Sequence, residues 1–340
     1  MKEGTNFIRR RLSHLTRLNI VKPSYFTFEL TNKCNFFCKY CDQWKIKPDK
    51  ELSLLEWKCV SKKIFDWMGP YNVKLSGGEP FLKKNIFDLI RYNNNLGIKT
   101  MINSNGYLID DKLAEKIVKS NVHFIKISLI SFNKDVNEDL RGRKDVFEKS
   151  MNAVKKLVYW KQKLNSNINI SLAFLMNSQN LEEVEEMILW AKKIGVRIYL
   201  QVLVHNFKSD VRENLEKSEL WPKNKKQIKE VFRKIILLKK NNYPIVQSMP
   251  ILKLMREYFL RNEKIILRTP CKISYYSFIV DPEGNVRFCF GRHKNGLVGN
   301  IKEDSPKDIW FSKQSNIERE NIRNCREFCR VHKPGRGFLI

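Results

Sequence analysis

Three closely spaced cysteines constrain this chain more than any other feature of its sequence. Cys34, Cys38 and Cys41 form the pattern C-x3-C-x2-C. Three thiolates this close together can bind three irons of a [4Fe–4S] cube and leave the fourth iron without a protein ligand. Closed, four-ligand coordination is typical of structural metal sites, so an iron with an open position predicts a reactive centre.

A zinc site is the alternative for this loop. Structural zinc takes four protein ligands, and Cys59 could supply a fourth thiolate. Zinc sites favour paired C-x2-C spacings, however, and Cys59 lies in an apolar periodic stretch, residues 54–60, where a single cysteine usually packs in the core. The spacing therefore favours the iron–sulfur cluster.

Aromatic residues flank the three cysteines, at Phe36, Phe37 and Tyr40. Burial and exclusion of solvent tune the potential of an iron–sulfur cluster. We therefore expect these rings to form an apolar collar around it.

A glycine-rich turn, Ser-Gly-Gly-Glu-Pro at residues 76–80, follows the β-like run 71–75. Gly77 and Gly78 would let the backbone approach a ligand where a Cβ would collide with it. Glu79 offers an acceptor for an ammonium group. By itself such a turn also fits an ordinary connection between a strand and a helix.

Together the two motifs resemble those of the radical S-adenosylmethionine (SAM) enzymes. In that family SAM chelates the open iron of the cluster, and the Gly-Gly-Glu-Pro turn binds the methionyl amino group of SAM. The resemblance implies iron ligation by Cys34, Cys38 and Cys41. It also implies that a second set of residues contacts the cofactors: Tyr40, Ser76, Gly77, Gly78, Glu79, Asn105, Ser128 and Arg141.

Among these, the polar residues after the third and fourth predicted strands have a second interpretation. Asn105, Ser128 and Arg141 occupy places that resemble SAM contacts in the family, and Arg141 could pair with the SAM carboxylate through two hydrogen bonds. Each fits equally well as a turn former or a surface residue.

Strand-like and helical patterns alternate from residue 24 to about 240. The strand-like runs are 25–30, 73–75, 99–102, 124–129, 169–174 and 197–202, and the helical stretches are 54–67, 85–94, 112–119, 147–163, 181–193 and 225–240. This alternation indicates parallel βαβ units. Six repeats predict an α/β fold, an open (β/α)6 partial TIM barrel, which is the fold that radical SAM enzymes use. Chemistry then belongs at the C-terminal ends of the strands, where both motifs lie.

The C-terminal third carries four more cysteines, Cys271, Cys289, Cys325 and Cys329. A hairpin turn at residues 281–285 would bring the first two close together. The stretch resembles the auxiliary-cluster region of the SPASM/twitch branch of radical SAM enzymes, in its shorter twitch form. The resemblance implies one fully ligated auxiliary [4Fe–4S] cluster, for which a four-cysteine zinc ribbon is the alternative.

We therefore expect three segments. Residues 1–23 form a basic N-terminal extension, residues 24–240 form the barrel, and residues 241–340 contain a bridging segment and a small auxiliary iron–sulfur domain of the twitch/SPASM kind.

The charge of the chain argues little about partners. Its net charge is +28, from 64 basic and 36 acidic residues, but the lysines are spread along the whole chain, often beside glutamates on helical stretches. That pattern is typical of solvated helix faces, and no DNA partner is expected.

No apolar run reaches the roughly 18 residues of a transmembrane segment, and the N-terminus lacks the apolar stretch of a secretion signal. We expect a cytoplasmic protein whose eight cysteines stay reduced for metal.

The resemblance also implies the reaction type. One electron, delivered by a reducing partner such as flavodoxin or ferredoxin, cleaves SAM, and the 5′-deoxyadenosyl radical abstracts hydrogen from the substrate. A fully ligated second cluster most simply accepts the electron left on the substrate. We therefore expect an oxidoreductase or epimerase that carries out a two-electron oxidation or an epimerisation.

Two departures from relatives bear on the substrate. Peptide maturases often carry a peptide-binding domain where only residues 1–23 precede the first strand, and sulfatase maturases place an aspartate where Phe290 stands. A small molecule such as a sugar or cyclitol is therefore the first expectation, and modification of a peptide or protein is the second. A non-catalytic iron–sulfur electron carrier has no need of an open iron. A zinc-stabilised nucleic-acid-binding protein is the last alternative.

Overall fold

A computed structural model describes residues 12–13, 16, 19–46, 50–204, 215–267, 270–292 and 295–326 of the chain. These residues contain a nine-stranded sheet in the order β6-β5-β4-β3-β2-β1-β7-β8-β9. The first six strands are β1 (Tyr25–Thr31), β2 (Asn72–Gly77), β3 (Lys99–Ser104), β4 (Phe124–Ser128), β5 (Asn169–Met176) and β6 (Arg197–Val202). Each of these pairs in parallel with the next, so the predicted open (β/α)6 partial barrel is confirmed.

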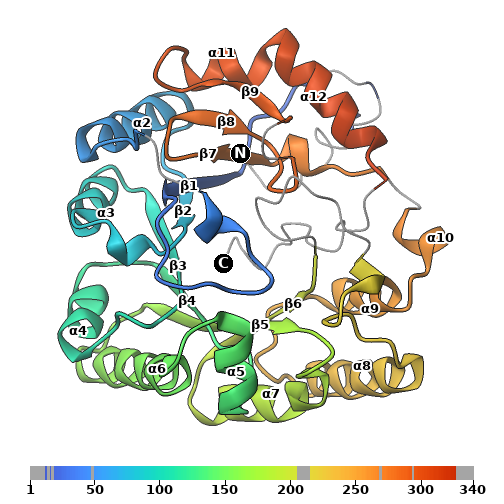
Figure 1. Cartoon of the computed structure of the whole chain (residues 1–340). Coiled ribbons are helices and arrows are strands. Elements are labelled where there is room, and N and C mark those ends of the chain that lie inside the picture. The colour runs from blue at the N-terminus through green and yellow to red at the C-terminus, as the bar shows by residue number, and fades with distance from the viewer. Residues whose placement is uncertain are drawn as a thin grey trace.

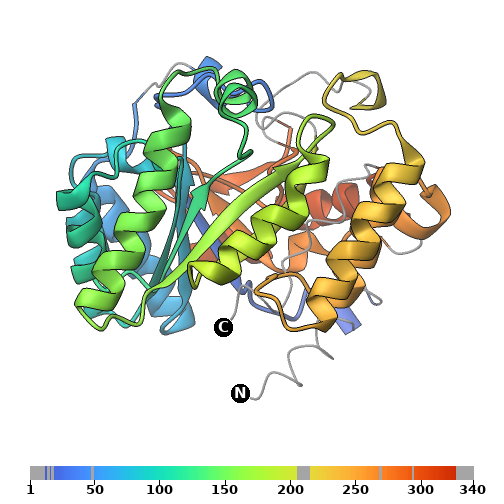
Figure 2. The same ribbon diagram turned by 90° about the horizontal axis from the view of Figure 1, so that it is seen from below.

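The helices of the barrel form a layer outside the curved sheet (Figures 1 and 2). They are α2 (Leu54–Met68), α3 (Ile86–Asn95), α4 (Asp111–Lys119), α6 (Val146–Lys163), α7 (Val184–Lys193) and α8 (Lys225–Lys240), whereas α5 (Lys134–Arg141) lies across one end of the barrel beside the loop that follows β1. Short 3-10 turns lie at Gln43–Lys45, Pro80–Leu82, Leu181–Glu183, Leu215–Lys217 and Ile273–Tyr275. Among the described residues, no helix is long and apolar enough to cross a membrane.

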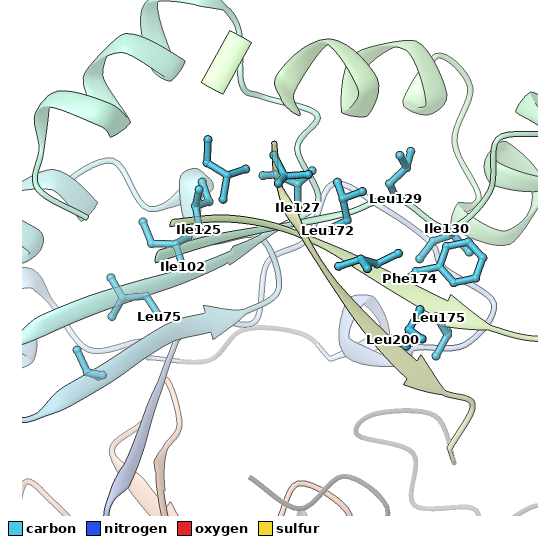
Figure 3. Packing of buried hydrophobic residues seen from close by; sticks show 14 of the residues in the cluster. Leu75, Ile102, Ile125, Ile127, Leu129, Ile130, Leu172, Phe174, Leu175 and Leu200 are labelled. Carbon is cyan, nitrogen blue, oxygen red and sulfur yellow. The ribbon is translucent and has the colours of Figure 1, made fainter. Parts of the chain in front are cut away.

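The two faces of the sheet differ in chemistry because strand residues alternate between them. Buried apolar side chains such as Leu75, Ile125 and Leu172 point outward to the helices and build the core, as Figure 3 shows. The residues between them on the strands, such as Lys74 and Lys126, face the interior of the barrel. Polar strand residues thus line the side on which chemistry is expected.

Helix α2 illustrates how local sequence sets an element. Ser53 and Glu56 form a capping box at its start, and Gly69 ends it with φ 72°. Its buried face includes Trp57 and Val60. Cys59, however, is exposed, so the expectation that it packs in the core is wrong. It lies two residues from Trp57, about 200° around the helix, and therefore faces solvent.

The C-terminal strands continue the barrel sheet instead of forming a separate one. The elements of this region are α9 (Met249–Phe259), α10 (Glu263–Ile266), β7 (Ser277–Val280), β8 (Asn285–Arg287), β9 (Leu297–Asn300), α11 (Pro306–Phe311) and α12 (Lys313–Asn324). Strand β7 pairs in parallel with β1, and β7, β8 and β9 form the antiparallel part of the sheet, which includes the predicted hairpin. Figure 1 shows this part beside β1 with α11 and α12 outside it. Strand β1 therefore joins the barrel to the C-terminal region.

Candidate iron–sulfur and SAM site

The loop with the first three cysteines follows β1 and is held in place by the end of α5. The amide of Phe37 donates to the carbonyl oxygen of Arg141 (3.3 Å), and the amide of Lys39 donates to that of Leu140 (3.0 Å). Arg143 adds a hydrogen bond from its guanidinium to the carbonyl oxygen of Asn35 (2.9 Å). The sequence reasoning missed α5, although Asn133 caps its start and Gly142 ends it in the left-handed conformation.

A half-buried carboxylate fixes the start of the same loop. Glu51 accepts hydrogen bonds from the Thr31 hydroxyl (2.6 Å) and the Asn32 amide (2.8 Å). Its second oxygen pairs with the Lys83 ammonium at 3.1 Å. Glu51 was not predicted as a site residue, because nothing in its local sequence distinguishes it from other exposed acids.

The three thiols lie close enough to influence one another. Burial raises the pKa of Cys34 to about 11 and that of Cys41 to about 12, and the charge of Cys38 raises the pKa of each further. Burial also raises the pKa of Cys38, whereas hydrogen bonds from Tyr40 and Arg141 lower it. Buried thiolates of this kind need a bound cation, so the donor set fits an iron–sulfur cluster.

The spacing of the donors also bears on the zinc alternative. Within the described part of the chain, no three His, Cys, Asp or Glu side chains meet around a position that could hold one ion. The ligands of a cube each bind a different iron and stand farther apart than the ligands of a single ion.

The glycine turn packs directly on the cysteine loop. The amide of Gly78 donates to the carbonyl oxygen of Thr31 (2.8 Å), and the amide of Glu79 donates to that of Lys33 (2.9 Å). A Cβ added at Gly78 would lie 2.0 Å from the Lys33 oxygen, and one at Gly77 would lie 2.4 Å from the Thr31 oxygen. The glycines are thus needed for contact with the loop backbone, and the expectation that they also let the backbone approach a ligand stays a prediction.

Glu79 is buried between the ends of β2 and β3. Its carboxylate accepts hydrogen bonds from the Ser104 hydroxyl (2.9 Å), the Asn105 amide (2.7 Å) and the Phe81 amide (3.2 Å). Burial raises the pKa of Glu79 to about 7, against these hydrogen bonds. A nearby ammonium group would favour the charged carboxylate. Its predicted contact with the SAM amino group stays a prediction.

The remaining predicted cofactor contacts gather at the same end of the sheet. Arg141 is buried and donates to the carbonyl oxygens of Ser128 (2.7 Å) and Asn105 (3.0 Å), as well as to Cys38. The amide group of Asn105 donates to the Asn35 side chain (2.7 Å). Ser76 lies beside Glu29 in the pairing of β2 with β1. Arg141 therefore positions the cysteine loop, and its pairing with the SAM carboxylate stays a prediction.

The aromatic collar is formed only in part. Phe36 is buried, with the Arg141 guanidinium 4.5 Å from the centre of its ring, and Tyr40 is half-buried beside Cys38. Phe37 is 54% exposed and packs edge-on against Trp44, so the expectation that it belongs to the collar is wrong. Adjacent residues in an extended loop face opposite sides, so only one of the two phenylalanines can face the cysteines.

The C-terminal cysteines also come together. Burial raises the pKa of Cys289 to about 12, and the charges of Cys271 and Cys325 raise it further. Arg292, three residues after Cys289, pairs with the buried carboxylate of Glu318 (2.5 Å) and ties this loop to α12. Cys329 lies outside the described residues. The three described thiols fit the predicted auxiliary cluster.

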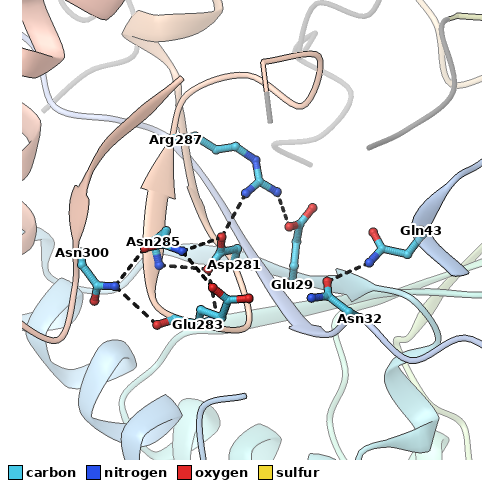
Figure 4. Close-up of polar contacts among 8 residues, drawn as sticks. All are labelled: Glu29, Asn32, Gln43, Asp281, Glu283, Asn285, Arg287 and Asn300. Carbon is cyan, nitrogen blue, oxygen red and sulfur yellow. Dashed lines mark hydrogen bonds and ion pairs between the residues drawn. The ribbon is translucent and has the colours of Figure 1, made fainter. Parts of the chain in front are cut away.

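A buried ion pair joins this region to the barrel, as Figure 4 shows. Arg287 of β8 is fully buried and pairs with Glu29 of β1. The same guanidinium lies 3.5 Å from the carboxylate of Asp281, which also accepts the amides of Glu283 (3.0 Å) and Asn285 (2.9 Å) in the hairpin turn. Because Cys289 follows Arg287 by two residues, this network sets the place of Cys289 relative to β1.

We expect Arg287→Met to destabilise the protein by about 3–5 kcal/mol, because it leaves the Glu29 carboxylate buried without its cation. The double variant Glu29→Gln/Arg287→Met should recover part of this loss. Denaturant unfolding of the anaerobic protein measures both. Arg233→Met is the control, since its pair with Glu230 is exposed on α8. Equal midpoints for Arg287→Met and Arg233→Met would show that the buried pair contributes nothing.

Comparison with known families agrees with this division of the chain. Residues 28–191 match the radical SAM superfamily, and residues 271–331 match the SPASM iron–sulfur cluster-binding domain. The first match covers the cysteine loop and the glycine turn. The second covers all four C-terminal cysteines.

Individual relatives are distant. An AdoMet-dependent heme synthase of Methanosarcina barkeri is 25% identical over 300 residues, which are 85% of this chain and 82% of that protein. The sporulation killing factor maturation protein SkfB of Bacillus subtilis is 30% identical over 178 residues, 52% of this chain. The match spans only 42% of SkfB, and likewise 42% of another M. barkeri relative, an Fe-coproporphyrin III synthase.

Among solved structures, Streptococcus suis SuiB bound to S-adenosylmethionine superposes with a TM-score of 0.69 at 14% identity, over 95% of this chain and 74% of SuiB. This likeness shows the fold, barrel and C-terminal region included. With both domains matched in this order, the chain belongs to the radical SAM superfamily, as an enzyme of its SPASM/twitch branch.

Proposed function

We propose that the enzyme abstracts hydrogen from a small-molecule substrate inside the barrel and passes the remaining electron to the auxiliary cluster. The radical SAM domain together with the SPASM iron–sulfur domain implies SAM and two [4Fe–4S] clusters. The observation that supports the proposal most is that β1 connects both cysteine groups. The first group follows β1 directly, and Cys289 follows β8, whose Arg287 pairs with Glu29 of β1. One sheet thus supports both redox centres.

The cofactors supply the one-electron chemistry and the hydrogen-abstracting group, and the chain supplies position and shielding. Cys34, Cys38 and Cys41 would hold the first cluster. The loop that carries these cysteines is held in turn by the backbone of α5. Gly77 and Gly78 keep the glycine turn against that loop, which places the Glu79 carboxylate beside it. Buried rings such as Phe36 exclude water from the thiols.

The second cysteine group would hold the auxiliary cluster through Cys271, Cys289, Cys325 and Cys329. Four thiolates leave no open iron, so this cluster suits electron transfer better than substrate binding. An auxiliary cluster without an open iron therefore supports oxidation of the substrate, or epimerisation in which the electron returns to the substrate. The alignment with the heme synthase, which extends over 300 residues, supports a small-molecule substrate.

Modification of a peptide is the second candidate. It is favoured by the 30% identity to the maturation protein SkfB over 178 residues.

The experiment that tests the proposal removes the auxiliary cluster. We expect the double variant Cys325→Ala/Cys329→Ala to cleave SAM to 5′-deoxyadenosine under strong reductant but to form no oxidised product, because the substrate radical has no electron acceptor. Product analysis by mass spectrometry measures this. Circular dichroism must accompany it, since metal binding and folding are coupled. Normal product formation by a folded variant would instead indicate a redox-neutral reaction and a structural role for this cluster.

A further inference from the structure

We infer that Arg292 raises the reduction potential of the auxiliary cluster, and that Glu318 is the positioning residue that holds the Arg292 guanidinium. The inference rests on the proposed function, in which the oxidised cluster gains the one electron that the substrate radical loses. It starts from an ion pair that lies beside two of the C-terminal cysteines.

Helix α12 carries Glu318 and Cys325 on the same face. The two residues are seven positions apart, and seven residues turn an α-helix by about 700°, which is nearly two full turns. Cys325 directly follows α12, and its amide continues the last turn by donating to the carbonyl oxygen of Ile322 (3.3 Å). This face of the helix is the inner one, because its buried residues are Ser315, Glu318, Arg319 and Ile322. A buried carboxylate thus precedes a cluster cysteine by two turns.

The Arg292 guanidinium binds this carboxylate through two hydrogen bonds. Its Nε donates to one oxygen of Glu318 (2.5 Å), and its Nη2 donates to the other (3.0 Å). The Glu318 side chain is 3% exposed and that of Arg292 is 19% exposed. A two-pronged pair between arginine and a carboxylate restricts the guanidinium to one orientation.

Neighbouring backbone groups pack closely against the same pair. The amide of Arg292 donates to the carbonyl oxygen of Cys289 (3.4 Å), and its guanidinium donates to that of Asn295 (3.4 Å). A Cβ added at Gly296 would lie 2.5 Å from the Arg292 carbonyl oxygen and 3.0 Å from a carboxylate oxygen of Glu318. The loop therefore fixes the position of Arg292 as well as its orientation.

The guanidinium interacts with the charges of two cysteines. The hydrogen bonds to Glu318 raise the pKa of Arg292, and the negative charges of Cys325 and Cys289 raise it further. An interaction of this kind requires opposite charges that lie near each other. Arg292 is therefore a positive charge beside two ligands of the predicted auxiliary cluster.

The carboxylate of Glu318 has the opposite effect on the cysteines. Burial raises the pKa of Cys289 most, and the charge of Glu318 adds to the rise. A buried carboxylate near thiolates is unfavourable unless a cation compensates it. Arg292 is that cation, so the presence of Glu318 on the inner face of α12 is explained by its hold on Arg292.

The charge beside a cluster affects its potential because reduction adds an electron to the cluster. A positive charge favours the reduced form and raises the potential, whereas a negative charge lowers it. The cation at Arg292 therefore favours transfer of the substrate electron to the auxiliary cluster.

The test is a redox titration of the anaerobic full-length protein with both clusters, followed by electron paramagnetic resonance. The variant with Cys34, Cys38 and Cys41 changed to alanine identifies the signal of the auxiliary cluster. We expect Arg292→Met to lower the potential of this cluster, because it removes the cation. We expect Glu318→Gln to raise it, because glutamine keeps an acceptor oxygen for the guanidinium and removes only the negative charge.

The opposite directions distinguish a charge effect from a structural one. Loss of a structural contact would disturb the cluster in the same way in both variants. Arg292→Lys keeps the charge without the two-pronged geometry, so its potential should lie between those of wild type and Arg292→Met. Iron analysis and circular dichroism report whether each variant is folded and holds both clusters.

Arg233→Met is the matched control. Arg233 binds Glu230 with the same two-pronged geometry, at 2.9 Å and 2.7 Å. This pair is exposed on α8, which lies across the barrel from α12 in Figure 1. The potential of the auxiliary cluster should be the same in Arg233→Met as in wild type.

Potentials that stay at the wild-type value in both Arg292→Met and Glu318→Gln, or that shift in the same direction, would overturn the inference. If Arg292→Met does not retain the auxiliary cluster, Glu318→Gln decides the question: a raised potential supports the inference, and an unchanged or lowered one overturns it. The proposed function is contradicted by a different result, normal product formation in Cys325→Ala/Cys329→Ala, which would leave the measured shifts of potential valid.

Discussion

The variant with Cys34, Cys38 and Cys41 all changed to alanine is expected to lose half of its iron and all SAM cleavage. Wild-type protein reconstituted without oxygen should hold about eight irons per chain as two [4Fe–4S] clusters, and the triple variant about four. The auxiliary cluster should remain, because its cysteines lie at the other end of the chain and are supported by β7, β8 and α12. Iron analysis, electron paramagnetic resonance and chromatography of 5′-deoxyadenosine measure these quantities.

Cys59→Ala provides the control for this experiment. Cys59 is exposed on α2, so its loss should change neither iron content nor SAM cleavage. Stoichiometric zinc in the isolated protein, with no uptake of iron on reconstitution, would contradict the cluster assignment.

The second large effect is expected for Gly78→Val. The new Cβ would lie 2.0 Å from the carbonyl oxygen of Lys33, the residue before Cys34, and 3.1 Å from that of Asn32. The side chain must push the cysteine loop away from the glycine turn and so break the hydrogen bond from Glu79 to Lys33. We expect SAM affinity to fall by at least about tenfold, equivalent to losing one or two good hydrogen bonds, while the auxiliary cluster keeps its iron.

Gly69→Ala serves as the control for Gly78→Val. A Cβ there meets nothing within 4 Å, although the φ of 72° adds backbone strain at the end of α2. Equilibrium binding of SAM to the anaerobic proteins compares the two variants, and circular dichroism reports their folding. If folded Gly78→Val binds SAM as tightly as wild type, the glycine turn has no part in holding the cofactor site together.

The regular elements of the barrel were predictable because their signals are local. Six strands and most of their helices lie within a few residues of the predicted runs, since apolar alternation and capping residues such as Ser53 act over short stretches. Helix α5 was missed because it has only eight residues and a strongly polar sequence. The same local reading placed Cys59 in the core and Phe37 in the collar, and both errors come from side-chain direction, which a periodic stretch alone does not specify.

The sequence by itself determined the chemistry: two cysteine groups of three and four, a glycine turn behind the second strand, and repeats that form a parallel barrel. Those features depend on residue type and short spacing. Only the tertiary structure decided that Gly78 meets Lys33, that α5 holds the cysteine loop, and that β7 extends the sheet from β1. These contacts join residues far apart in the chain. They depend on strand register and on the curvature of the open sheet, which no local pattern encodes.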